Sequence, residues 1–362
     1  MPIAARSRAL LAAAFLAASA ACAREPQPVV IGAIGPWSLD YGASARRGME
    51  LAAEQVNRAG GVGGRPLRID FRDDGADASR AVRLVSDFAD DRSVSAVIGP
   101  LNSGPLVAAA RVADGRIVAL SPTAASPQLN GISPWVFRLI SNDSVFGMTL
   151  GRHAAHLGRK AAVLYDNNAF GRGGADAFRR NFGGQIVSVD PLWPVAPRPR
   201  AFVEWFRRQG VDLVYVAGLT SSGQAVLGEA RRQGFSGKVL GTDSWTPLAR
   251  EGRVAEGVYI ATRFSVLEPR PEVAAFDAAY RTRWRGEPDG FAGFGYDAVQ
   301  ILSRAAAQAG GSRASLRDWL RSMPEHAGVT GPIRFTPGGE PRATRFVLLQ
   351  VRDGRLALVD ET

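Results

Sequence analysis

The sequence predicts an α/β protein built from two doubly wound lobes, each with a parallel sheet covered by helices. Short apolar runs alternate with segments of helical composition along most of the chain, which is typical of strands joined by helical crossovers. A unit of strand, polar elbow, helix and strand at 94–127 is followed by a second such unit at 212–247. The 362 residues also suit two domains of ordinary size.

The N-terminus has the pattern of an export signal. Arg6 and Arg8 precede a short apolar run at 9–18, and small residues continue to Cys22, the only cysteine. Such a run is too short to span a bilayer and is typical of a secretory signal peptide. We expect residues 1–22 to be this signal and Cys22 to be an acylated, membrane-tethering lipoprotein cysteine. Cleavage nearby without acylation is the alternative, and both place the protein outside the cytoplasm.

The first lobe is expected to begin with a strand at 29–34. The helix after it, 43–58, carries Met49, Ala52 and Val56 on one face at helical spacing. Further elements expected in this lobe are a strand at 67–71, a helix at 79–90, a strand at 94–98, a helix at 105–114 and strands at 117–120 and 135–139.

The second lobe is expected to begin near Asp143. Its expected elements are helices at 144–157, 173–182, 201–209 and 224–233 and strands at 161–165, 186–189, 212–217, 239–241 and 257–262. After these, in the part of the chain that returns to the first lobe, helices are expected at 272–284, 294–309 and 314–322, followed by a strand at 331–335. The final strands, 344–351 and 355–359, are joined by Asp353-Gly354 and predict a hairpin.

The return of the chain predicts discontinuous lobes. We place lobe 1 at 28–140 and 264–332, and lobe 2 at 141–263 and 333–362. Crossovers are then expected near 137–143, 257–265 and 331–337. Three such connections make a hinge, and hinge closure around a ligand is a known domain motion.

Both units place a Gly-x-x-x-Ser-Gly elbow before a helix, from Gly99 to Gly104 and from Gly218 to Gly223. Elbows at the carboxyl ends of parallel strands are where small ligands bind in open sheets. A helix start with a hydroxyl is also a ready anion site. The first unit ends in hydroxyls and the second in the carboxylate of Asp243, so facing lobes would clamp a molecule with one anionic and one cationic end. If no ligand binds, the same residues would serve only as helix caps.

Other classes of function have little support. The net charge of +10 is scattered, with no nucleic-acid-binding motif, and indicates a solvated surface that favours an anionic membrane face. No Gly-x-Ser-x-Gly elbow, phosphate loop or His-Glu-x-x-His is present. His153 and His156 lack a third ligand at metal spacing. We therefore expect no enzyme, no cofactor, no metal site and no nucleic-acid partner.

The chain also resembles a known family over nearly all of residues 28–360. The resemblance is carried by Ile31-Gly32-Ala33-Ile34-Gly35-Pro36, Glu54-Gln55-Val56-Asn57-Arg58-Ala59-Gly60-Gly61, Val97-Ile98-Gly99-Pro100-Leu101-Asn102-Ser103, Ser121-Pro122-Thr123-Ala124, Phe170-Gly171 and Gly241-Thr242-Asp243. In order and spacing these resemble type I periplasmic binding proteins of the branched-chain amino acid class. The resemblance implies a monomeric receptor that delivers a ligand to an ABC permease. The alternative is a ligand-sensing lipoprotein of the same fold that acts on a partner protein.

The resemblance also implies a binding site. In that family, groups at the positions of Ser103, Thr123 (through its backbone) and Ala125 hold the ligand carboxylate. Either Ser126 would supply the hydroxyl that Ala125 lacks, or the N–H group would suffice. Asp243 matches the acid that takes the ligand ammonium. Tyr41, Phe170 and Phe291 match aromatic residues of the pocket, although core packing would also account for them. Because Leu219 replaces a family tyrosine, the ligand stays open: branched-chain amino acids first, then other amino acids, amides such as urea, or small carboxylates.

Overall fold

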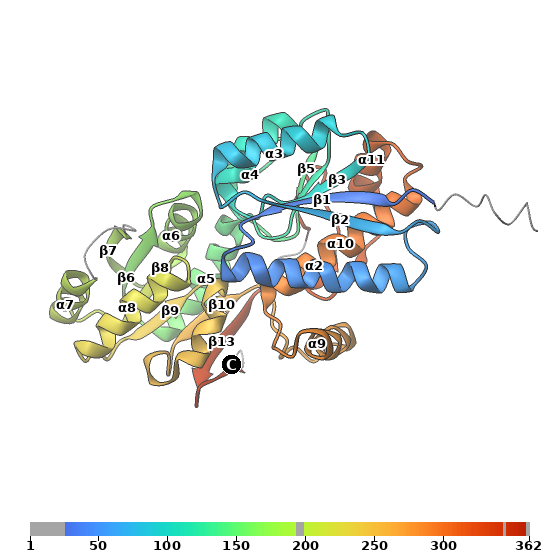
Figure 1. Cartoon of the computed structure of the whole chain (residues 1–362). Coiled ribbons are helices and arrows are strands. Elements are labelled where there is room, and N and C mark those ends of the chain that lie inside the picture. Colours follow the sequence, from blue (N-terminus) through green and yellow to red (C-terminus); the bar gives the residue numbers. More distant parts are fainter. Residues whose placement is uncertain (1–25, 193–198, 343–344, 360–362) are drawn as a thin grey trace, which may run out of the picture.

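The computed structural model describes residues 26–192, 199–342 and 345–359. The two larger sheets lie in two lobes, which Figure 1 shows with β1, β2 and β3 in one and β6 to β10 with β13 in the other. Both sheets are flanked by helices, which confirms the predicted α/β class. The expected signal peptide and Cys22 lie outside the described residues.

The first sheet has the order β2-β1-β3-β4-β5, and its paired strands all run parallel. The strands are β1 (Val29–Gly35), β2 (Leu67–Asp73), β3 (Val94–Ile98), β4 (Ala119–Ser121) and β5 (Val136–Arg138). On β1, Ile31 packs into the core on one face, whereas Val30 and Ile34 pack on the other. This period of two, with both faces buried, is the pattern of a central parallel strand.

Helices cover both faces of the first sheet. α2 (Asp40–Arg58) and α10 (Gly290–Gln308) lie side by side on one face, and α3 (Ala78–Asp90) and α4 (Ser103–Ala113) cover the other (Figure 1). α9 (Pro271–Trp284) and α11 (Arg313–Ser322) complete the lobe. The elbows that follow β3 and β4 come at the carboxyl ends of these two parallel strands and therefore lie at the same edge of the sheet.

The second sheet has the order β14-β13-β10-β9-β8-β6-β7. Its parallel part contains β6 (Lys160–Asp166), β7 (Gln185–Leu192), β8 (Leu213–Ala217), β9 (Lys238–Gly241) and β10 (Tyr259–Thr262). The predicted hairpin is confirmed: β13 (Val347–Arg352) and β14 (Arg355–Leu358) pair antiparallel beside β10. One face is covered by α5 (Asp143–Leu157) and α6 (Ala169–Asn181), and the other by α7 (Arg200–Gln209) and α8 (Thr220–Arg232).

Three helices begin four residues earlier than predicted. α6 begins at Ala169, α8 at Thr220 and α10 at Gly290, whereas the predicted starts were 173, 224 and 294. Two of these starts are fixed by upstream caps, because Asn168 accepts from the amide of Gly171 and Asp289 accepts from that of Ala292. In the second expected elbow, Gly218 to Gly223, the last four residues therefore form the first turn of α8.

The third crossover was predicted too early. β11 (His326–Gly328) and β12 (Gly331–Ile333) form a small antiparallel pair, and Ile333 and Phe335 lie in the core of the first lobe. Phe335 packs edge-on against Phe137, with ring centroids 5.2 Å apart. Lobe 1 therefore continues beyond the predicted boundary at 332, and the chain rejoins the second sheet at β13.

Trp245 fixes the elbow that follows β9. This elbow forms 3-10 turns, η2 (Asp243–Val254), and the Trp245 side chain is fully buried. Its indole Nε1 donates to the carbonyl of Gly218 at 2.9 Å, and its ring lies against Gly223. Trp245 therefore joins the end of β9 to the start of α8.

None of the described helices is both long and apolar enough to cross a bilayer.

Gly223 and Gly228 provide a test of this packing, because both lie on α8. A methyl group at Gly223 would lie 2.6 Å from the Trp245 ring, whereas one at Gly228 would meet nothing within 4 Å. Gly223→Ala should lower the free energy of unfolding by about 1–3 kcal/mol through overpacking. Gly228→Ala should raise it by about 0.5–1 kcal/mol through helix propensity. Urea unfolding of both variants checks this, and equal effects would contradict the role of Trp245.

Candidate functional site

Ser103 joins the two polar elbows of the first lobe. It occupies the first position of α4, and its Oγ accepts from the amides of Ala125 and Ser126, each at 3.1 Å. Thr123 Oγ1 donates to the carbonyl of Leu101 at 2.9 Å. Since a serine oxygen that accepts two N–H groups still has its own hydrogen to donate, these contacts orient Ser103 as a donor.

Ala125 and Ser126 are buried residues that contact Ser103 through their backbone amides. Each is only 1% exposed, and both of their amides are donated to Ser103. Their carbonyls are also engaged, with the amide of Asp143 at 2.8 Å and with Nη1 of Arg138 at 2.8 Å. These contacts show that the two residues support Ser103, and their direct contact with a ligand carboxylate stays a prediction. Sequence alone could not show that Ser103 uses their N–H groups.

Two of the three expected aromatic residues meet in the first lobe. Tyr41 and Phe291 lie in the first turns of α2 and α10, with ring centroids 5.4 Å apart, and both are half-buried. The Tyr41 hydroxyl accepts from Nδ2 of Asn102 at 2.9 Å. Burial raises the pKa of Tyr41, so its hydroxyl stays protonated at neutral pH. Phe170, also half-buried, lies in the first turn of α6 in the other lobe.

Asp243 is partly exposed, but it is not an isolated carboxylate. Its side chain is 22% exposed, and Oδ2 accepts from Nη1 of Arg263 at 3.2 Å. Oδ1 accepts from the amide of Ser244 at 3.1 Å. A carboxylate has about four acceptor positions, so Asp243 keeps room for another donor.

Arg263 is the main residue that the sequence analysis missed. It follows β10 directly, is 4% exposed, and carries a guanidinium whose Cζ lies 3.9 Å from the centroid of the Phe146 ring. Nη2 donates to Oδ1 of Asp143 at 3.1 Å, while Nη1 reaches Asp243. An arginine directly after an apolar strand was the available signal.

Asp143 completes the cluster. It begins α5 and is 5% exposed, and burial raises its pKa to about 7, although the Arg263 charge opposes this. Because its amide donates to Ala125, contacts run from Ser103 through Ala125, Asp143 and Arg263 to Asp243. The structure thus links the hydroxyl and the carboxylate that the sequence placed on different lobes.

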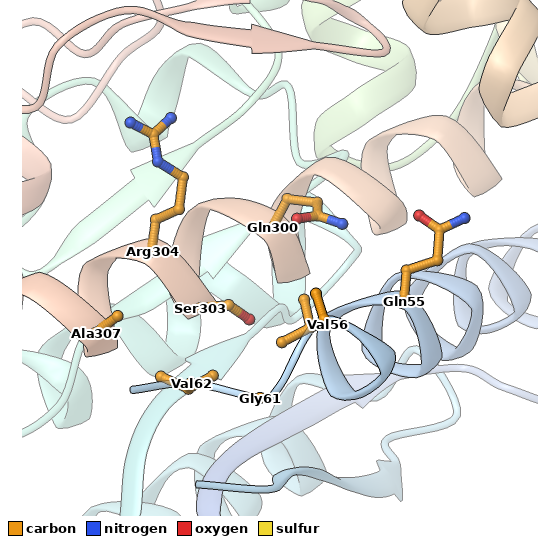
Figure 2. A pocket seen from close by; sticks show the side chains of 9 residues that line it. Gln55, Val56, Gly61, Val62, Gln300, Ser303, Arg304 and Ala307 are labelled. Carbon is orange, nitrogen blue, oxygen red and sulfur yellow. The ribbon is translucent and has the colours of Figure 1, made fainter. Parts of the chain in front are cut away.

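Of two cavities, one lies away from this chain of contacts and one borders it. The larger, about 450 Å³, lies between α2 and α10, as Figure 2 shows. It is lined by Gln55, Val56, Ala59, Gly61, Val62, Gln300, Ser303, Arg304 and Ala307. None of these is a residue that the sequence analysis proposed for the site. The smaller, about 20 Å³, lies beside the hinge and has Arg263 in its wall, with room for about one water molecule. Among the described residues no group of three or more side chains could hold a metal ion.

Comparisons with known proteins agree with this architecture. Residues 28–355 match the family described as periplasmic binding protein. The chain is 26% identical to an amino acid binding protein of Pseudomonas aeruginosa over 90% of each sequence, and 26% identical to the Leu/Ile/Val-binding protein homolog 1 of Brucella suis over 87% of each. The structure of an ABC transporter substrate-binding protein from Desulfitobacterium hafniense in complex with Leu gives a TM-score of 0.82 at 28% identity. That comparison covers 92% of this chain and 100% of the other.

Arg263→Ala should destabilise the protein strongly. Removing one partner of a buried ion pair typically costs about 3–5 kcal/mol, because the remaining charge is buried without compensation. Arg283→Ala is the matched control, since its pair with Glu54 has side-chain exposures of 46% and 41% and should contribute at most about 1 kcal/mol. Chemical unfolding at pH 7.5 measures both. A loss at Arg263 no larger than at Arg283 would mean that Arg263 does not hold the cluster together.

Proposed function

Because the chain belongs to the periplasmic binding protein family, we propose that it captures a small amino-acid-like ligand between its lobes and delivers it to the permease of an ABC importer. Members of this family are solute-binding proteins rather than enzymes. They act outside the cytoplasm, as the N-terminal sequence also indicates. The branched-chain amino acids come first as ligands, since relatives of this chain carry the name Leu/Ile/Val-binding protein.

The observation that carries the proposal is the opposed chemistry of Ser103 and Asp243. Ser103 is oriented as a hydroxyl donor in lobe 1, and Asp243 is a partly exposed carboxylate in lobe 2. A ligand carboxylate would accept from Ser103 in a charge-assisted hydrogen bond, and an ammonium would pair with Asp243. Since each lobe supplies only one of the two partners, ligand binding would favour the closed arrangement.

The side chain of the ligand would lie against the aromatic residues. Tyr41 and Phe291 are in contact in lobe 1, and Phe170 stands at the start of α6 in lobe 2. These half-buried rings suit an apolar side chain, because covering them removes apolar area from water. Thr123 would contribute through its backbone, because its hydroxyl already donates to Leu101.

We also propose that the mature protein is tethered to the membrane through an acylated Cys22. The n-region, the short apolar run and the single cysteine support this. A tether would keep the receptor near its permease, and the binding chemistry described above does not depend on it.

Asp243 gives the sharpest test of the proposed function. Titration calorimetry should show binding of L-leucine and at least hundredfold weaker binding of 4-methylpentanoate, which lacks only the ammonium. Asp243→Ala should weaken leucine binding by a similar factor, because truncating one partner of a buried charge pair costs about 2–5 kcal/mol. Asp176→Ala, which removes an exposed acid of the same lobe, is the control and should leave affinity unchanged.

Equal affinity for leucine and 4-methylpentanoate would show that no acid of the protein recognises the ammonium. Unchanged leucine affinity in Asp243→Ala, with the variant folded by circular dichroism, would remove Asp243 from the site. Failure of a wider screen of amino acids, amides and small carboxylates would overturn the proposed function itself.

A further inference from the structure

We propose that Asp143 is a second acceptor for the ligand ammonium, and that the ligand and a proton compete for its unpaired carboxylate oxygen. The inference rests on the proposed function, because it requires a ligand with an ammonium group. It adds a residue to the site that neither the sequence pattern nor the family resemblance indicated.

The geometry places the free oxygen of Asp143 at the meeting of the two lobes. Oδ1 is engaged by Arg263, whereas Oδ2 is buried and has no hydrogen-bond partner among the described residues. A methyl group built on Gly173 would lie 3.5 Å from this Oδ2 and 3.3 Å from Cδ of Pro127. Oδ2 therefore lies where α6, at Gly173, approaches Pro127 of lobe 1, which directly follows Ser126 in the chain.

The charges around Arg263 call for one more cation. Asp143 and Asp243 share this single guanidinium, so with both acids ionised the cluster keeps one excess negative charge. A buried acceptor without a partner is unfavourable, and so is a buried excess charge. An ammonium placed between the two carboxylates would satisfy Oδ2 and balance the charge.

Without ligand, a proton bound to Asp143 can remove the excess negative charge instead. Burial raises the pKa of Asp143 to about 7, with Arg263 lowering it and Asp243 raising it. The other groups that face it are Arg138 of β5, which also lowers the pKa, and Tyr215 of β8, whose own pKa is raised by burial and by the Asp143 charge. The ammonium prefers the ionised form, so ligand affinity should rise with pH and level off above about 7. The stability that protonated Asp143 gives the free protein is lost as the pH rises to about 7.

Calorimetry of the full-length mature protein tests this directly. L-Leucine is titrated at each pH in phosphate and in imidazole buffer, whose different ionisation enthalpies report the number of protons released. Binding should release close to one proton at pH 6 and almost none at pH 8.5. Between pH 5.5 and 6.5 the affinity should rise close to tenfold as the pH rises by one unit, as linkage to one proton requires.

Asp143→Asn separates this role from a structural one. Asparagine keeps an oxygen for Arg263, but it neither titrates nor attracts an ammonium, so the variant should bind leucine more weakly and without proton release at pH 6. Glu340→Gln is the control, because it removes a carboxylate from another buried arginine, Arg138, on the lobe 1 side. It should keep the proton release of the wild type.

Leucine binding without proton release at pH 6 would overturn the role of Asp143 and leave the proposed function standing. Undiminished release in Asp143→Asn would do the same. If no amino acid binds at any pH, the proposed function and this inference fall together.

Discussion

The position of the buried Arg263 guanidinium constrains much of the region between the lobes. A cation removed from water must be paired and hydrogen-bonded to be tolerated. Arg263 meets this requirement with Asp143 at the start of α5, Asp243 at the start of η2 and the ring of Phe146. These partners come from separate parts of the chain. All of them belong to lobe 2, so the cluster holds together the side of that lobe next to the hinge, and removing one partner would leave a buried charge unpaired.

The two lobes place chemically different side chains at equivalent positions, the elbows that follow their strands. In both, strand ends bring elbows to one edge of a parallel sheet, which is where small ligands bind in open sheets. Lobe 1 uses neutral groups: Ser103 ties its two elbows together and keeps one hydrogen to donate. Lobe 2 uses charge, with Asp243 held by Arg263 and by the Trp245 packing of η2. A zwitterion is complementary to this pair of surfaces.

Much of the fold could be predicted because it depends on local pattern: apolar runs, helical spacing, the elbow repeat and the Asp353-Gly354 turn. Misplaced helix starts came from caps such as Asn168, whose role depends on the backbone conformation actually adopted. The third crossover was misplaced because Phe335 packs on Phe137, almost two hundred residues away in sequence. Arg263 was missed for the same reason, since its partner Asp143 lies 120 residues earlier in the chain and meets it only in the folded protein. Ser103 and Asp243 could be proposed from the sequence, because polar residues directly after an apolar run are recognisable as elbows at strand ends.

The central claim is that a hydroxyl of one lobe and a carboxylate of the other hold the two ends of one small zwitterion. A crystal structure of the protein grown with L-leucine tests it most directly. The account predicts leucine between the lobes, its carboxylate within about 3 Å of Ser103 Oγ and its ammonium within about 3 Å of an Asp243 oxygen. Leucine bound elsewhere, or between the lobes with neither side chain in hydrogen-bond reach, would contradict it.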